Sequence, residues 1–150
     1  MFRLELITRI KAPRQVCFDL ARSIDAHLTS LQHTKEKAIA GRINGLIEKG
    51  ETVTWEARHF GFNWRMTVAI TEMRAPDYFC DEMSSGPFKK MKHEHFFTSN
   101  NEETIMKDVF ECAAPFGILG RAAEIVFLKK YMKNLLLARN TELTKIAEQK

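Results

Sequence analysis

Two histidines and an aspartate fall at spacings that could bring them together on one face of a sheet. His93 and His95 lie in residues 88–99, where apolar and polar side chains alternate as they do in a half-buried strand. The next alternating segment contains Asp108, and the turn-forming pair Asn100-Asn101 stands between the two segments. Because residues two apart on a strand share a face, we expect both histidines to point inward.

Counting outward from a turn centred on Asn100-Asn101 predicts the pairing of this hairpin. It places His93 opposite Asp108. Continuing across the Gly86-Pro87 turn places Asp81 beside His93, so that a row of Asp81, His93 and Asp108 would cross three strands. The same count pairs Phe97 with Thr104, His95 with Met106, Met91 with Phe110, Glu94 with Lys107 and Phe79 with His95.

This row could do chemistry or could be structural. A histidine flanked by carboxylates in a partly apolar cavity can orient a ligand hydroxyl or carbonyl, or act as a general base. Equally, the three groups could only satisfy one another's hydrogen bonds, as buried polar groups must. The catalytic role is therefore left open, with His93, Asp108 and Asp81 as its candidates.

A metal ion is a weaker interpretation of the same residues. His93, His95 and Asp108 are adequate ligands for a divalent ion, but two histidines on a strand are weak evidence without a further committed ligand. No Ser-His-Asp motif, P-loop or GxGxxG is present. We expect no metal and no cofactor, and we expect His27, His33 and His59 at the surface or in loops.

The elements that must position these residues can be read from hydrophobic periodicity. Residues 2–10 alternate as a strand, and Pro13 then opens the first of two short helices that end near residue 32. Ser23 is suited to cap the second helix. From residue 36 to about 112, short alternating segments separated by glycine and polar turns predict five or six antiparallel strands.

The buried face of the sheet and the last helix follow from the same patterns. From about Gly120 to the end there is no proline and no further glycine, which predicts one long helix. Its apolar stripe should pack on the sheet. The expected inward side chains of the strands are Trp55, Trp64, Met66, Val68 and Ile70, and those of the helix are Ile125, Leu128, Met132, Leu135, Leu136, Leu143 and Ile146.

This order of elements resembles the SRPBCC or START-like superfamily, which includes the birch-pollen allergen and the polyketide cyclases. The resemblance covers residues 1–150 as a single domain. It implies an α+β helix-grip fold, in which a curved antiparallel sheet of six to seven strands wraps around a long C-terminal helix, with two short helices after the first strand. A bacterial ligand-binding group of this superfamily, sometimes labelled cell-division-inhibitor-like, is similar in the stretch Gly86-Pro87-Phe88, His93-Glu94-His95-Phe96-Phe97, Thr104, Asp108 and Pro115-Phe116-Gly117.

The resemblance implies a cavity between the sheet and the last helix. We expect it to bind a hydrophobic or amphipathic small molecule such as a lipid, a polyketide or an aromatic metabolite, without catalysis. A cyclase, dehydratase or hydrolase using the His-carboxylate pair is the alternative, and a chaperone-activator-like interaction domain is the third. The expected ligand-binding residues are Trp55, Trp64, Met66, Phe79, Asp81, Met91, His93, His95, Met106, Asp108, Phe110, Met132 and Leu136.

Composition agrees with a folded domain that has an apolar interior. The chain has 11 Phe and 2 Trp but only 2 Tyr, so its aromatic rings mostly lack a polar handle. Its net charge of +4 comes from Lys and Arg interleaved with acids, which argues against nucleic-acid binding. Three widely spaced cysteines and the absence of a signal-peptide pattern favour a cytoplasmic protein. We expect no stable membrane insertion, and a monomer or a weak homodimer.

Overall fold

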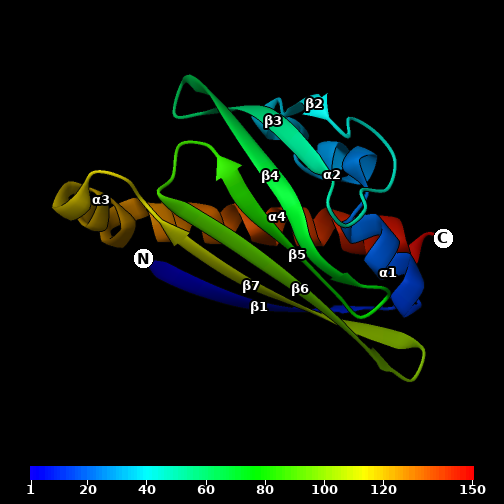
Figure 1. Ribbon diagram of the computed structural model, residues 1–150. Helices are drawn as coiled ribbons and strands as arrows, with labels where there is room; N and C mark the ends of the chain where they lie inside the picture. Colours follow the sequence, from blue (N-terminus) through cyan, green and yellow to red (C-terminus); the bar gives the residue numbers. More distant parts are fainter.

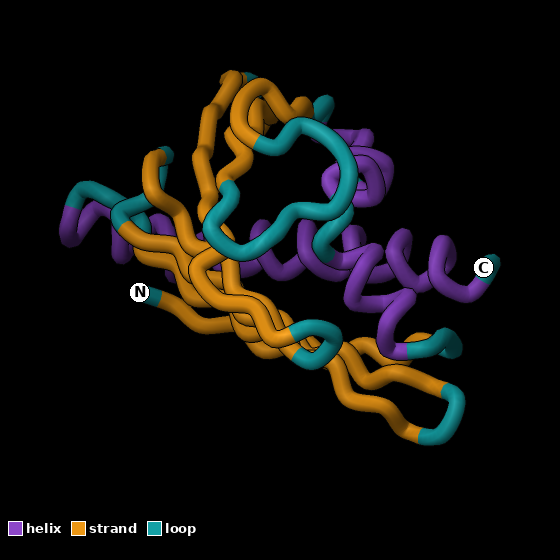
Figure 2. The backbone as a smooth tube through the Cα atoms, turned by 45° about the vertical axis from the view of Figure 1, so that its right-hand side comes forward, coloured by secondary structure: helices purple, strands orange, loops and turns teal.

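A computed structural model describes residues 1–150. A 7-stranded antiparallel sheet is ordered β1-β7-β6-β5-β4-β3-β2, and it curves around a helix that runs along its concave side (Figure 1). Figure 2, turned by 45°, shows the helix passing behind the strands and extending beyond them toward the C-terminus. The expected helix-grip fold is confirmed.

The strands alternate buried and exposed residues, as the sequence pattern predicts. In β1, for example, Phe2, Leu4 and Leu6 are buried whereas Arg3 and Glu5 are exposed. The strands are β1 (Phe2–Ile10), β2 (Lys37–Gly41), β3 (Thr52–His59), β4 (Phe62–Arg74), β5 (Tyr78–Ser85), β6 (Lys90–Asn100) and β7 (Glu103–Ala113).

Two short helices follow β1, and their ends have identifiable causes. Pro13, with no N–H to leave unpaired, precedes the first helix. The Ser23 hydroxyl accepts a hydrogen bond from the Ala26 amide at 3.1 Å and so caps the second helix. The helices are α1 (Arg14–Ala21) and α2 (Ile24–Ser30), followed by a short 3-10 turn, η1 (Gln32–Thr34).

The C-terminal helix is continuous but changes its winding near its start. It consists of α3 (Gly117–Ala123), a π-helical segment η2 (Glu124–Leu128) and α4 (Lys129–Glu148). Gly120 is required where α3 passes the preceding loop, because a Cβ there would lie 1.9 Å from the Pro115 carbonyl oxygen. No helix is both long enough and apolar enough to cross a membrane.

One part of the predicted helix stripe is wrong. Leu128, Leu136 and Leu143 are buried as expected, but Ile125 is 84% exposed. A π-helical segment accommodates an extra residue, so the 3.6-residue count fails when it is carried back across η2. In addition, α3 projects beyond the strands, where no sheet covers it (Figure 1).

The core closes the end of the sheet next to α1. Phe18 of α1 is fully buried, and its ring packs edge-on against the rings of Phe79 and Phe97 at 5.5 and 5.4 Å. This packing fills the space between sheet and helices at that end. The space nearer α3 is left open.

Candidate functional site

A cavity of about 740 Å³ lies between the concave face of the sheet and α4. This volume falls in the usual range for small-molecule sites. Most of its wall is apolar, and Trp55, Trp64 and Phe110 are among its aromatic residues. All the residues predicted to bind a ligand line this cavity except Met106 and Asp108, which are fully buried behind the wall.

The predicted strand register is right between β5 and β6 and wrong between β6 and β7. Asp81 pairs with His93, as expected. Across the last hairpin, however, His93 lies opposite Phe110, and Asp108 lies opposite His95. The turn is centred one residue later than predicted, since Asn100 pairs with Glu103. The partner therefore moves by two residues, which keeps every side chain on its predicted face.

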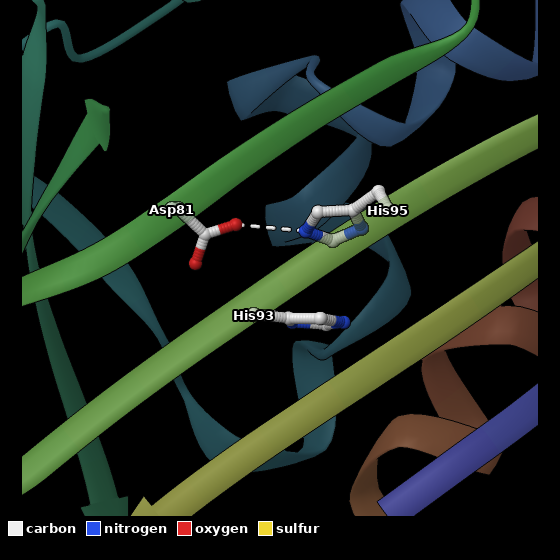
Figure 3. Close-up of side chains that lie close together, drawn as sticks. All are labelled: Asp81, His93 and His95. Carbon is white, nitrogen blue, oxygen red and sulfur yellow. Dashed lines mark hydrogen bonds and ion pairs between the residues drawn. The ribbon is translucent and has the colours of Figure 1, made fainter. Parts of the chain in front are cut away.

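The histidines and aspartates form two hydrogen-bonded pairs. His93 Nε2 lies 2.8 Å from Asp108 Oδ1, and His95 Nε2 lies 2.8 Å from Asp81 Oδ2. The two imidazole rings are stacked, with centroids 3.8 Å apart (Figure 3). The expected hydrogen bond between His93 and a carboxylate is thus present, and His95 belongs to the same cluster.

Two polar residues of α4, neither of them predicted to belong to the site, complete the cluster. Arg139 Nη1 donates to Asp108 Oδ1 at 3.3 Å, and Asn140 Nδ2 donates to Asp108 Oδ2 at 2.8 Å. Both residues are buried. They stand between Leu136 and Leu143, on the apolar stripe of the helix, where polar side chains signal a buried partner.

The protonation states follow from these contacts. Burial alone would raise the pKa of Asp108, but hydrogen bonds and the Arg139 charge hold that pKa well below its ordinary value. Burial also opposes the ionised form of Asp81, and the contact with His95 outweighs it and lowers the pKa. Two carboxylates are therefore ionised at neutral pH.

The two histidines shift in opposite directions. Burial, together with the neighbouring charge on His95, lowers the pKa of His93. Burial also disfavours a charged His95, but the flanking carboxylates of Asp108 and Asp81 outweigh it and raise the pKa. The raised pKa favours the protonated form of His95 between its two carboxylates, and the lowered pKa favours the neutral form of His93. Arg139, beside Asp108, adds a second positive group to the cluster.

A neutral His93 presents an unpaired acceptor. The ionised Asp108 only accepts, so His93 Nε2 carries the proton and Nδ1 carries the lone pair. His93 Nδ1 has no hydrogen-bond partner in the protein and is accessible from the cavity. The one fully buried side-chain atom without a hydrogen-bond partner is a different one, His95 Nδ1, which lies 3.3 Å from Asp108 Oδ1. Asp81 Oδ1 is likewise unpaired, since only Oδ2 meets His95 (Figure 3).

The same cluster fits a metal ion poorly. Ligand atoms of Asp81, His93 and His95 lie within 4.8 Å of one another. However, the two rings stack at an interplanar angle of 28°, so their in-plane lone pairs run side by side and do not converge on one point. At least one ring would have to turn before both could bind one ion.

Two of the remaining histidines also line the cavity, contrary to expectation. His27 stacks on Trp55 with centroids 4.1 Å apart and bonds to Glu36. His59 Nδ1 meets the Tyr131 hydroxyl, which ties the end of β3 to α4 across the opening. These contacts join residues distant in sequence, so the local pattern of apolar and polar residues does not predict them.

Comparison with known structures identifies the architecture. A START superfamily protein from Mycobacterium smegmatis superposes with a TM-score of 0.74 at 12% identity, covering 97% of that chain and 98% of this one. The chain has the START-like helix-grip fold. An aromatase/cyclase from Streptomyces sp. R1128 matches with a TM-score of 0.75 at 12% identity, over 99% of this chain and 94% of that one.

A plant structure shares the START-like fold as well. Ginseng major latex-like protein 151 from Panax ginseng matches with a TM-score of 0.68 at 15% identity, over 97% of both chains. No family model and no curated protein sequence matches the chain significantly. At these identities the likeness establishes the START-like fold and leaves function to the site.

Proposed function

We propose that the protein encloses an apolar small molecule that carries a hydroxyl group at its buried end. The observation that carries this proposal is the pair of unpaired acceptors, His93 Nδ1 and Asp81 Oδ1, in the wall of an otherwise apolar cavity. An acceptor left unpaired in an apolar site costs free energy, and a ligand that donates a hydrogen bond removes that cost. A hydroxyl is such a donor.

Charge argues for a neutral ligand. Each carboxylate has a basic partner, His95 beside Asp81 and Arg139 beside Asp108, so the cluster offers no unpaired charge to attract an ion. The rest of the wall, with Trp55, Phe88 and Phe110, favours an aromatic or aliphatic body. Ligand identity beyond this class depends on shape.

A matched pair of fluorescent probes tests the proposal. 1-Hydroxypyrene and 1-methoxypyrene share a ring system, but only the first donates a hydrogen bond. We expect the protein to bind the hydroxyl probe about fivefold to tenfold more tightly, as one net hydrogen bond of about 1 kcal/mol would give. His93→Phe should reduce the difference because it removes one of the two acceptors, whereas His33→Phe, at an exposed position, should preserve it.

Other outcomes would count against it. Equal affinity for the two probes would overturn the role of the acceptors, and binding of neither would overturn the cavity as a binding site. A His93→Phe variant with a lowered melting temperature but unchanged discrimination would show that the cluster is structural.

Catalysis is the second candidate, favoured by the Asp108–His93 pair, because a carboxylate that fixes the imidazole tautomer is the arrangement of a general base. Burial lowers the pKa of His93, however, which makes it a weak base. No observation favours an interaction domain acting through the outer face of the sheet, where Arg3, Glu5 and Lys107 form ion pairs with one another.

A further inference from the structure

Large apolar side chains are exposed around the mouth of the cavity. Phe60, Trp64, Phe116, Leu119 and Phe127 line the cavity and are also open to solvent, so they form its rim. They come from two segments, the β3–β4 hairpin and the start of the C-terminal helix. The segments touch, since the Phe60 ring lies 5.7 Å from that of Phe127.

The apolar surface continues outward beyond the rim. Ile118 and Val126 on the helix are 86% and 76% exposed, and Phe62 on β4 is 67% exposed, yet none of them lines the cavity. Ile125 belongs to the same set. Soluble monomers rarely leave so many large apolar side chains together in water, and such patches mark interaction sites. We call these residues and the rim together the mouth surface.

The charges beside the mouth surface have one sign. Arg121, Lys129, Lys130 and Lys133 are exposed on the same stretch of helix. Its single acid, Glu124, is buried and is bound by the amino terminus at 2.9 Å and by the Ala114 amide at 2.8 Å. The apolar surface is therefore bordered by cations with no exposed carboxylate on that stretch.

This combination distinguishes between possible occupants. A symmetric dimer through the mouth surface would bring the cations of both copies to one interface, with no exposed carboxylate of that stretch to pair with them. A bilayer containing anionic lipids supplies an apolar phase for the exposed side chains and negative headgroups for the cations. An interfacial helix with apolar residues on one side and lysines beside them has the pattern of such a contact.

We propose that the mouth surface docks reversibly on anionic lipid bilayers, with its apolar side chains in the interfacial layer. The cavity would then open toward the apolar phase, so that a ligand could pass between membrane and protein without crossing water. This proposal does not depend on which ligand is bound.

Vesicle sedimentation tests it. Vesicles of phosphatidylcholine alone are compared with vesicles in which about a third of the lipid is phosphatidylglycerol. We expect the protein to sediment with the anionic vesicles and at least tenfold more weakly with the neutral ones, because each lysine near an anionic surface contributes about 1 kcal/mol. Raising the salt concentration should weaken the binding.

Two pairs of variants separate the apolar part from the charged part. Ile118→Ser with Ile125→Ser, and Lys129→Glu with Lys130→Glu, should each weaken binding about tenfold or more. The matched controls are Ile7→Ser, which is 71% exposed on β1, and Lys11→Glu with Lys150→Glu, two exposed lysines beside the C-terminal end of α4. The controls should bind like the unaltered protein.

Trp64 provides a direct readout of insertion. It is 39% exposed at the rim, whereas Trp55 is buried, so brominated lipids should quench Trp64 alone and Trp64→Phe should abolish the quenching. Failure to bind anionic vesicles, equal binding to neutral ones, or controls as weak as the variants would overturn the proposal. The proposal would also be overturned if the protein does not bind vesicles but forms a dimer that Ile118→Ser dissociates. The mouth surface would then bind a second copy of the chain.

Discussion

Replacing Asp108 by asparagine should destabilise the protein strongly, because it leaves a buried positive charge without its counter-ion. Asp108 is 0% exposed and Arg139 only 5%, and their closest atoms are 3.3 Å apart. Removing one partner of a buried ion pair typically costs about 3–5 kcal/mol. For a domain of this size each kcal/mol lowers Tm by about 2–4 °C, so Tm should fall by roughly 10 °C.

Equilibrium unfolding in urea, followed by circular dichroism, measures this cost. The matched control is Asp77→Asn, which breaks the ion pair with Arg14 at the surface and should cost less than about 1 kcal/mol. Adding Arg139→Met to Asp108→Asn removes both buried charges and should recover a large part of the lost stability. The reasoning is refuted if Asp108→Asn lowers the free energy of unfolding no more than the surface control does, or if adding Arg139→Met lowers it further.

Three further outcomes are expected. Because the pKa of His95 is raised in the folded protein, protonation of His95 stabilises the fold fully below its unfolded pKa near 6.5, and this stability is lost as pH rises through the folded pKa. His95→Gln should therefore lower the free energy of unfolding more at pH 5.5 than at pH 8.5. An equal loss at the two pH values would contradict the raised pKa. Phe18→Ala should cost about 3–5 kcal/mol in urea unfolding, against less than about 0.5 kcal/mol for the exposed Phe116→Ala; comparable losses would show that α1 is not part of the core. Gly120→Ala should cost about 1–3 kcal/mol in the same assay, because its Cβ would overlap the Pro115 carbonyl; no loss would mean that the loop shifts freely.

The sequence predicts which face each strand residue occupies better than it predicts the neighbours. A period of two fixes the face, so His93, His95 and Asp108 were correctly placed inward. The turn position is less certain, because Ser99, Asn100 and Asn101 are all turn-forming residues. In the structure Asn101 takes a positive φ of 60°, which puts the turn one residue later and Asp108 opposite His95.

Errors on the C-terminal helix have different causes. Arg139 and Asn140 have no predicted role, because charged and amide side chains on a helix are usually exposed. Their position on the stripe of Leu136 and Leu143 was an available signal. The exposure of Ile125 was not predictable from periodicity, since neither the π-helical winding nor the projection of α3 beyond the sheet is encoded in a local pattern.

The polar cluster and the mouth surface make the two ends of the cavity chemically different. The cluster is fixed to α4 through Arg139 and Asn140, deep against the sheet, and it offers hydrogen-bond acceptors. The mouth is bounded by apolar side chains, and its one polar tie across the opening is the contact of His59 with Tyr131. An amphipathic molecule is therefore best accommodated with its hydroxyl inward and its apolar end toward the opening. In that orientation the apolar end is the first part to leave the protein, and it leaves through the surface that we propose to contact lipid.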